Sequence, residues 1–178
     1  MLKLLKGAVP GKISAFLGIL IAILVFLDLR LKEWAYINLS GPPRDSRILI
    51  DRFLGLTYHR NHGAAFGFLG DAGWSQWFLV VVKVVILIMI LIYEFKMPKE
   101  KKYWLLRIPL ALIFAGGLGN LIDRFWLGYV RDMMEFLFIN FPIFNLADVY
   151  VVTGVFSFLV FELFIVKSFD EDKKVSKE

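Results

Sequence analysis

The carboxylates and amides that could do chemistry in this chain lie in or beside long apolar stretches. A charged residue near the middle of a membrane costs about 3 kcal/mol and marks a functional site by default. The candidates are Asp28 with Lys32, Asn120 with Asp123 and Arg124, Asn145 with Asp148, and Asp132 in the loop between the last two groups. Their position near the ends of apolar segments predicts a site at one membrane surface.

The residue types restrict the chemistry of such a site. The chain has no cysteine, which excludes thiolate nucleophiles and cysteine-ligated zinc. It also lacks a G-x-S-G-like stretch with a partnering histidine in its apolar segments, and it lacks an H-E-x-x-H motif. His59 and His62 have no obvious third ligand, so we expect no metal and no other cofactor. The remaining possibility is hydrolysis, in which two carboxylates that share one proton activate a water molecule.

The acidic residues differ in their surroundings, which predicts different roles. Asp148 would occupy the first turn of a helix, where the helix dipole favours the anion. Asp132 has apolar neighbours on both sides, and these would desolvate the carboxyl group and raise its pKa. We therefore predict that Asp148 is the base and Asp132 the acid of a coupled pair.

A second pairing stays open at this point. The stretches N-L-I-D (Asn120–Asp123) and N-L-A-D (Asn145–Asp148) are alike, which favours Asp123 with Asp148 as the pair. Structural interpretations also exist. Asp28 and Lys32 would form an ion pair that locks helices together, the second stretch would cap a helix, and Asp123 with Asn120 and Arg124 would form a satisfied polar cluster at a helix end.

The elements that must position these residues are membrane helices. The chain has 178 residues, of which 58% are hydrophobic, and a mean hydropathy of +0.67. About 20 apolar residues span a bilayer, and this criterion predicts spans at residues 13–34, 74–95, 104–122 and 146–166. The first is too long for a signal peptide and no cleavage site follows it, so we expect a retained anchor. We predict an all-α integral membrane protein with four transmembrane helices in a single domain, residues 1–178.

Lysines predict the orientation of these spans. They precede the first span, fill the link between the second and third, and follow the fourth. The net charge of +5 therefore reflects membrane topology, and we expect no nucleic-acid partner. By the positive-inside rule both termini would be cytoplasmic, with external loops at residues 35–73 and 123–145. Residues 47–60 read as one or two strands. Together with the apolar stretch Phe136–Phe144 they would form a small β-sheet cradle on the outer membrane surface.

Five stretches together resemble the lipoprotein signal peptidase family, also called signal peptidase II, the aspartyl peptidases of the bacterial inner membrane. They are D-L-R-L-K-E-W (28–34), N-H-G-A-A-F-G-F-L (61–69), G-G-L-G-N-L-I-D-R (116–124), V-R-D (130–132) and F-N-L-A-D (144–148), in the family's order and spacing. The resemblance implies Asp132 and Asp148 as the catalytic pair. Substrate-binding or supporting roles would fall to Asn61, Asn120, Asp123, Arg124, Asn145, Asp28 and Lys32.

The resemblance also implies the reaction and the partners. The chain would remove signal peptides from diacylglyceryl-modified prolipoproteins, cleaving just before the lipidated cysteine, as a multi-pass monomer in contact with membrane lipid and with its site at the external face. Gly116, Gly117 and Gly119 would form a smooth groove for the signal-peptide helix, or would pack the third span against the first. Arg131 departs from the family pattern and would lower the pKa of Asp132.

Two other functions compete with this interpretation. A transporter or ion-relay protein would place membrane carboxylates along a whole pathway, whereas the second and fourth spans look nearly bare at mid-depth. A structural membrane subunit would use the Asn and Asp pairs only as helix ends. Asp148→Asn would distinguish them, because asparagine also caps a helix but cannot replace a catalytic carboxylate.

Overall fold

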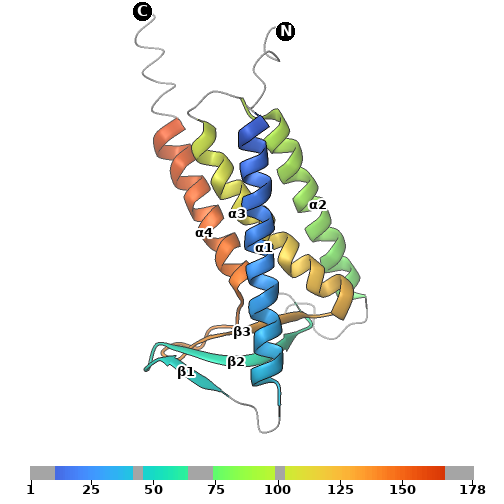
Figure 1. The fold of residues 1–178 in the computed structure, drawn as a ribbon, viewed down its shortest axis with the longest axis vertical. Helices are drawn as coiled ribbons and strands as arrows, with labels where there is room; N and C mark the ends of the chain where they lie inside the picture. The colour runs from blue at the N-terminus through green and yellow to red at the C-terminus, as the bar shows by residue number, and fades with distance from the viewer. Residues whose placement is uncertain (1–10, 42–45, 64–73, 99–102, 167–178) are drawn as a thin grey trace, which may run out of the picture.

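Four long helices form a bundle with a small sheet at one end (Figure 1). The computed structural model describes residues 11–41, 46–63, 74–98 and 103–166. The helices are α1 (Gly11–Leu39), α2 (Ser75–Lys96), α3 (Trp104–Leu127) and α4 (Leu146–Val160), and α4 continues as a π-helical segment, η4 (Phe161–Val166). All four carry a segment that is long and apolar enough to cross a membrane. The prediction of four transmembrane helices is confirmed.

The helix α3 is the centre of the bundle and packs against α1, α2 and α4. Half of its most apolar segment is buried inside the protein, against 6–11% in the other three helices. Two glycines permit this packing. A Cβ at Gly116 would lie 2.2 Å from the carbonyl oxygen of Ala147, and one at Gly119 would lie 2.5 Å from the Asp28 carboxylate. The expected groove for a signal-peptide helix is therefore wrong at these glycines, because α4 and α1 occupy that face.

The sheet is antiparallel and has the strand order β1 (Arg47–Ile50), β2 (Leu54–Asn61) and β3 (Val130–Phe136). The predicted strands within residues 47–60 are confirmed. The third strand was expected in the stretch Phe136–Phe144, and this is wrong, because the V-R-D segment supplies it. Phe144 makes only an isolated bridge with Met134. The sheet consequently brings Asp132, in the middle of β3, opposite His59 of β2.

Two helices extend beyond their predicted ends. The helix α1 continues to Leu39 because Ala35 and Leu39 are fully buried against Tyr58 and Met133 of the sheet. The helix α3 continues past residue 122 to Leu127 and ends at Gly128, whose φ of 77° is left-handed. Both segments that were predicted as external loops are therefore shorter than expected. Contacts with the sheet, which a hydropathy window cannot detect, hold these extra turns.

Candidate active site

The start of α4 is fixed by a reciprocal pair of hydrogen bonds. Asn145 is the N-cap, and its Oδ1 accepts the backbone N–H of Asp148 at 3.0 Å. The Oδ2 of Asp148 accepts the backbone N–H of Asn145 at 3.1 Å. This is a capping box, which satisfies helix amides that would otherwise lack partners. The predicted capping by the N-L-A-D stretch is confirmed, and it holds the Asp148 carboxylate at the mouth of the bundle.

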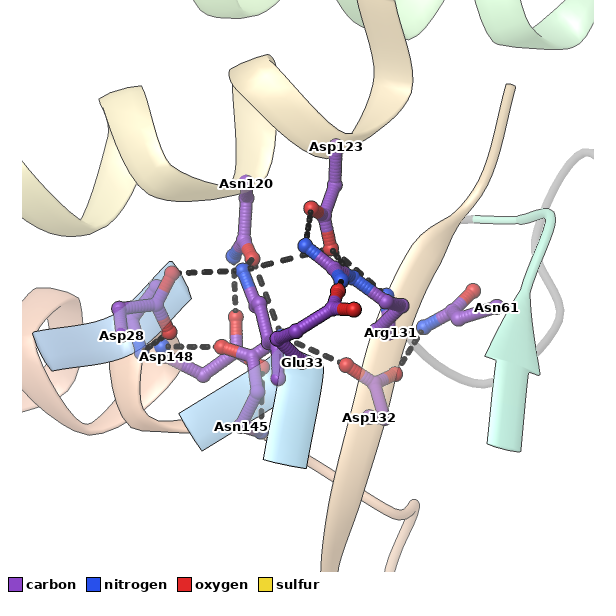
Figure 2. A network of polar contacts seen from close by, with 11 residues as sticks. Asp28, Glu33, Asn61, Asn120, Asp123, Arg131, Asp132, Asn145 and Asp148 are labelled. Atoms are coloured by element: carbon purple, nitrogen blue, oxygen red, sulfur yellow. Dashed lines mark hydrogen bonds and ion pairs between the residues drawn. The ribbon is translucent and has the colours of Figure 1, made fainter. Parts of the chain in front are cut away.

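Two asparagines connect this cap to the acidic residue of β3 (Figure 2). The Nδ2 of Asn145 donates to Asp132 Oδ1 at 2.6 Å and to Asn120 Oδ1 at 3.0 Å. The Nδ2 of Asn120 in turn donates to Asp148 Oδ1 at 2.8 Å. Asp132 and Asp148 are thus the two ends of one continuous chain of hydrogen bonds. Among the described residues, every donor to these two carboxylates is a neutral amide.

Asp132 is almost completely buried, with 1% of its surface exposed. Its other oxygen, Oδ2, accepts a hydrogen bond of 2.8 Å from Asn61 Nδ2. Burial and the negative charge of Asp148 raise the pKa of Asp132 to about 7, although the amide donors of Asn61 and Asn145 act in the opposite direction. The direction agrees with that inferred from its apolar neighbours in the sequence.

Arg131 does not act on Asp132 as its sequence position suggested. Neighbouring strand residues face opposite sides, and the Arg131 guanidinium is turned toward Asp123 and Glu33. It donates to Asp123 at 2.8 and 3.2 Å and to Glu33 Oε2 at 2.8 Å. The backbone N–H of Arg131 also donates to Asp123 Oδ2 at 3.0 Å. The expected lowering of the Asp132 pKa by Arg131 is therefore wrong.

A buried cation joins α1 to this network. Lys32 Nζ lies 2.7 Å from Asp28 Oδ2, donates to Asn120 Oδ1 at 2.9 Å, and is 3.7 Å from Asp123 Oδ2. Asp28 Oδ1 accepts the backbone N–H of Ala147, in the first turn of α4, at 2.9 Å. The predicted ion pair that locks helices together is confirmed. It joins α1 to α3 and α4, immediately behind the capping box.

Arg124 is not the partner of Asp123 that the sequence suggested. It donates instead to Gln76 Oε1, in the first turn of α2, at 2.8 Å and to the carbonyl oxygen of Gly63, just after β2, at 2.7 Å. Arg124 therefore helps to form the wall of the site, whereas Asp123 belongs to the ion pairs of Arg131 and Lys32.

A cavity of about 530 Å³ lies in front of the two linked carboxylates. Its polar lining residues include Asp132, Asp148, Asn61, Asn120, Arg124 and Lys83. Its apolar lining residues are Leu79, Val130, Phe136, Phe141, Pro142, Ile143, Phe144, Val149 and Val152. Asp28, Lys32 and Asp123 do not line this cavity. The candidate residues therefore divide into a group that faces an apolar chamber and a group that supports it from behind.

The comparisons with known proteins agree with this architecture. The family model described as signal peptidase (SPase) II matches residues 20–165. The lipoprotein signal peptidase of Streptococcus agalactiae serotype Ia is 40% identical over 144 residues, which are 80% of this chain and 88% of that protein. That of Streptococcus pneumoniae is 40% identical over 149 residues, covering 84% and 93%.

Solved structures agree as well. Two that are described as bacterial membrane enzymes match with TM-scores of 0.71 and 0.74, at 30% and 29% identity, covering 84% and 85% of this chain and 87% and 95% of theirs. The chain belongs to the signal peptidase II family. It is accordingly an aspartic-type membrane peptidase, and the transporter and structural-subunit interpretations are set aside.

Two residues of this signal peptidase II site were missed in the sequence. Glu33, near the end of the predicted first span, extends the ion pairs of Arg131, a residue 98 positions away in the sequence. Lys83 lines the cavity from the middle of α2, in the span that looked nearly bare. A signal for Lys83 was present, because it is the one charged residue between Ser75 and Tyr93.

Proposed function

We propose that this chain is an intramembrane aspartyl endopeptidase that removes the signal peptide from diacylglyceryl-modified prolipoproteins. It cleaves just before the lipidated cysteine by means of water activated by Asp132 and Asp148. One observation carries this assignment: these two carboxylates face the same apolar cavity and are linked through Asn145 and Asn120. The chain acts as a single peptidase domain and needs no cofactor.

The surroundings of the pair support different roles for its members. Two N–H donors and the first turn of α4 stabilise negative charge on Asp148, which suits a general base. The pKa of Asp132, raised to about 7 by burial and by the charge of Asp148, allows it to hold a proton at neutral pH. Asp148 takes a proton from water while protonated Asp132 donates a hydrogen bond to the scissile carbonyl. The hydroxide equivalent then attacks that carbonyl.

Collapse of the resulting tetrahedral intermediate completes the reaction. The C–N bond breaks, the leaving nitrogen takes up a proton from the pair, and a carboxylate forms on the signal peptide. Asn61 and Asn145 keep Asp132 oriented through these steps, and Asn120 does the same for Asp148. Asp123 is unsuited to replace either member, because Arg131 and Lys32 already compensate its charge.

The shape and position of the site support the substrate class. The cavity walls are mainly aliphatic and aromatic, which suits an apolar signal segment and acyl chains. The sheet, whose strand β3 carries Asp132, and the start of α4, which carries Asp148, lie at one end of the bundle, and α1 begins at the other end (Figure 1). With the lysine-rich segments cytoplasmic, the site opens at the external face of the bacterial inner membrane. There the protein works as a monomer surrounded by lipid.

The experiment uses purified protein in detergent with a lipidated prolipoprotein and the same precursor without its diacylglyceryl group. We expect cleavage of the lipidated precursor alone, with the new N-terminus at the modified cysteine by mass spectrometry. Asp132→Asn and Asp148→Asn should each lower kcat by about 10²–10⁴-fold. Equal cleavage of both precursors would contradict the substrate class. Substantial activity in either variant would contradict the assigned pair.

A further inference from the structure

Lys83 is a cation that lines the cavity and has no hydrogen-bond or ion-pair partner among the described residues. It is the one charged residue between Ser75 and Tyr93, a stretch in which the side chains otherwise suit lipid. It lines the same cavity as Asp132 and Asp148. A basic residue in such a position is expected to pair or to serve function.

Lys83 is half-buried, whereas the fully buried cations of the bundle all have partners. Lys32 lies against Asp28, Arg107 against Glu94, and Arg124 against Gln76 and Gly63. Lys83 makes no hydrogen bond or ion pair with any residue in the part of the chain that the structure describes. Asp148 and Asp132 are near enough to attract its charge, and Arg124 and Lys32 are near enough to repel it. Its three N–H donors are therefore available to a ligand.

The position of Lys83 along α2 indicates which part of a substrate it meets. Gln76, nearer the sheet, contacts Arg124, and Leu87, deeper in the bundle, lies against Gly117 of α3. Lys83 lies between these two points and about 12 Å along the helix from Ser75. It therefore lies on the side of the cavity away from the sheet, where we expect the membrane-embedded segment before the scissile bond to enter.

A signal peptide has a particular need at this point. Inside a membrane it must be helical to satisfy its backbone, but it must become extended to present one peptide bond to a pair of carboxylates. The last four carbonyl groups of a helix have no partner within the helix, and its C-terminal end carries partial negative charge. An ammonium group placed where the helix becomes extended would donate hydrogen bonds to these carbonyl groups and would compensate the partial negative charge.

Most of the other donors that line the cavity already have partners, although the Nε of Arg124 is buried without one among the described residues. Asn61 and Asn120 donate to Asp132 and Asp148, and the two terminal nitrogens of Arg124 are bonded to Gln76 and Gly63. We propose that Lys83 is a substrate-binding residue, which donates hydrogen bonds to the backbone carbonyls exposed where the signal-peptide helix unwinds before the scissile bond. This rests on the proposed function and assigns a specific role to α2 in it.

The test is steady-state cleavage of the lipidated precursor by Lys83→Met, which keeps an unbranched side chain and removes the donors. We expect KM to rise about tenfold or more, with kcat within about threefold of the wild type. Lys83→Arg keeps the donors and should restore most of the KM. Lys96→Met, at the exposed end of the same helix, is the matched control and should behave as wild type.

A second set of substrates locates the contact. Each of the five residues before the cleavage site is replaced in turn by glutamate, whose carboxylate is a stronger acceptor than a carbonyl. At one position the wild type should tolerate glutamate far better than Lys83→Met does. The inference is overturned if KM is unchanged in Lys83→Met, or if kcat falls and the pH profile shifts at constant KM, since Lys83 would then act on the carboxylates. If the wild type cleaves no lipidated precursor, the proposed function itself fails and the inference with it.

Discussion

The chain contains the four-residue pattern N-L-x-D twice, and the two copies lie in different structural surroundings. Asn120–Asp123 lies within α3, where both polar side chains project from a continuous helix. Asn145–Asp148 straddles the start of α4, where the asparagine is the N-cap and the aspartate completes the capping box. The two asparagines meet, since Asn145 Nδ2 donates to Asn120 Oδ1. The two aspartates face different partners.

Charge compensation is the difference between these aspartates. Asp123 is 1% exposed, takes hydrogen bonds from the Arg131 guanidinium on both oxygens and has Lys32 3.7 Å away. Within the described part of the chain, Asp148 accepts hydrogen bonds only from amide N–H groups, and it reaches the cavity. A carboxylate enclosed by cations is structural, whereas one held by neutral donors next to open space is available for chemistry. The contacts, and not the motif, distinguish them.

Among the substitutions that test this difference between Asp123 and Asp148, Lys32→Met is expected to have the largest effect on stability. Lys32 is fully buried, and its loss leaves Asp28 without its ion pair and Asp123 with only Arg131. Removing one partner of a buried pair costs about 3–5 kcal/mol. Thermal unfolding in detergent should therefore show a large drop in melting temperature. Lys96→Met serves as control, and an unchanged melting temperature in Lys32→Met would contradict the supporting role.

Arg131→Gln should have a smaller effect, and on stability more than on chemistry. It removes charged hydrogen bonds to Asp123 and Glu33, worth about 1.5–3 kcal/mol. We expect a lower melting temperature with kcat within a few-fold of wild type. Arg52→Gln changes an exposed arginine and should leave both unaltered. If Arg131→Gln abolished activity in a folded protein, Asp123 would have to be assigned a catalytic role.

Asn145→Ser separates capping from the link between the carboxylates. Serine keeps an acceptor at the N-cap but has no amide to donate to Asp132. The melting temperature should change little, while kcat falls about tenfold, as expected for a lost hydrogen bond to an acid. Asn38→Ser, which removes only a local bond to the Trp34 carbonyl, is the control. A large loss of stability with normal kcat would reverse the interpretation.

The change of the rate with pH near neutrality is expected to be the smallest of these effects. The pKa of Asp132 is raised to about 7, so its proton is present below that pH and lost above it. Because the proposed mechanism requires protonated Asp132 and this pKa is that of the free enzyme, kcat/KM should fall about threefold between pH 6.5 and 7.5 and about tenfold per unit above pH 8. Initial rates in buffers of constant ionic strength measure this. A rate that rises across the interval would contradict the assigned roles.

Local patterns predicted much of the fold and part of the site. Hydropathy was sufficient for the four spans, and the N-L-A-D stretch was sufficient for the capping box, because both depend on neighbouring residues. The partner of Arg131 could not be inferred in the same way. Strand alternation turns Arg131 away from Asp132, and only the sheet brings it to Asp123 and Glu33.

The same limit applies to the helix ends and to Lys83. The last turns of α1 depend on Tyr58 and Met133, which are distant in the sequence. Lys83 was visible as a charge in an apolar span, but only the packing of α2 beside α3 places it in the wall of the cavity.

The most direct test compares Asp123→Asn with Asp148→Asn in one preparation, with the lipidated precursor in detergent. The same substitution is made in the same motif, and asparagine preserves size and capping. We expect Asp148→Asn to be folded with kcat lower by about 10²–10⁴-fold, and Asp123→Asn to be less stable but within about tenfold in kcat. An inactive, folded Asp123→Asn beside an active Asp148→Asn would contradict the central claim.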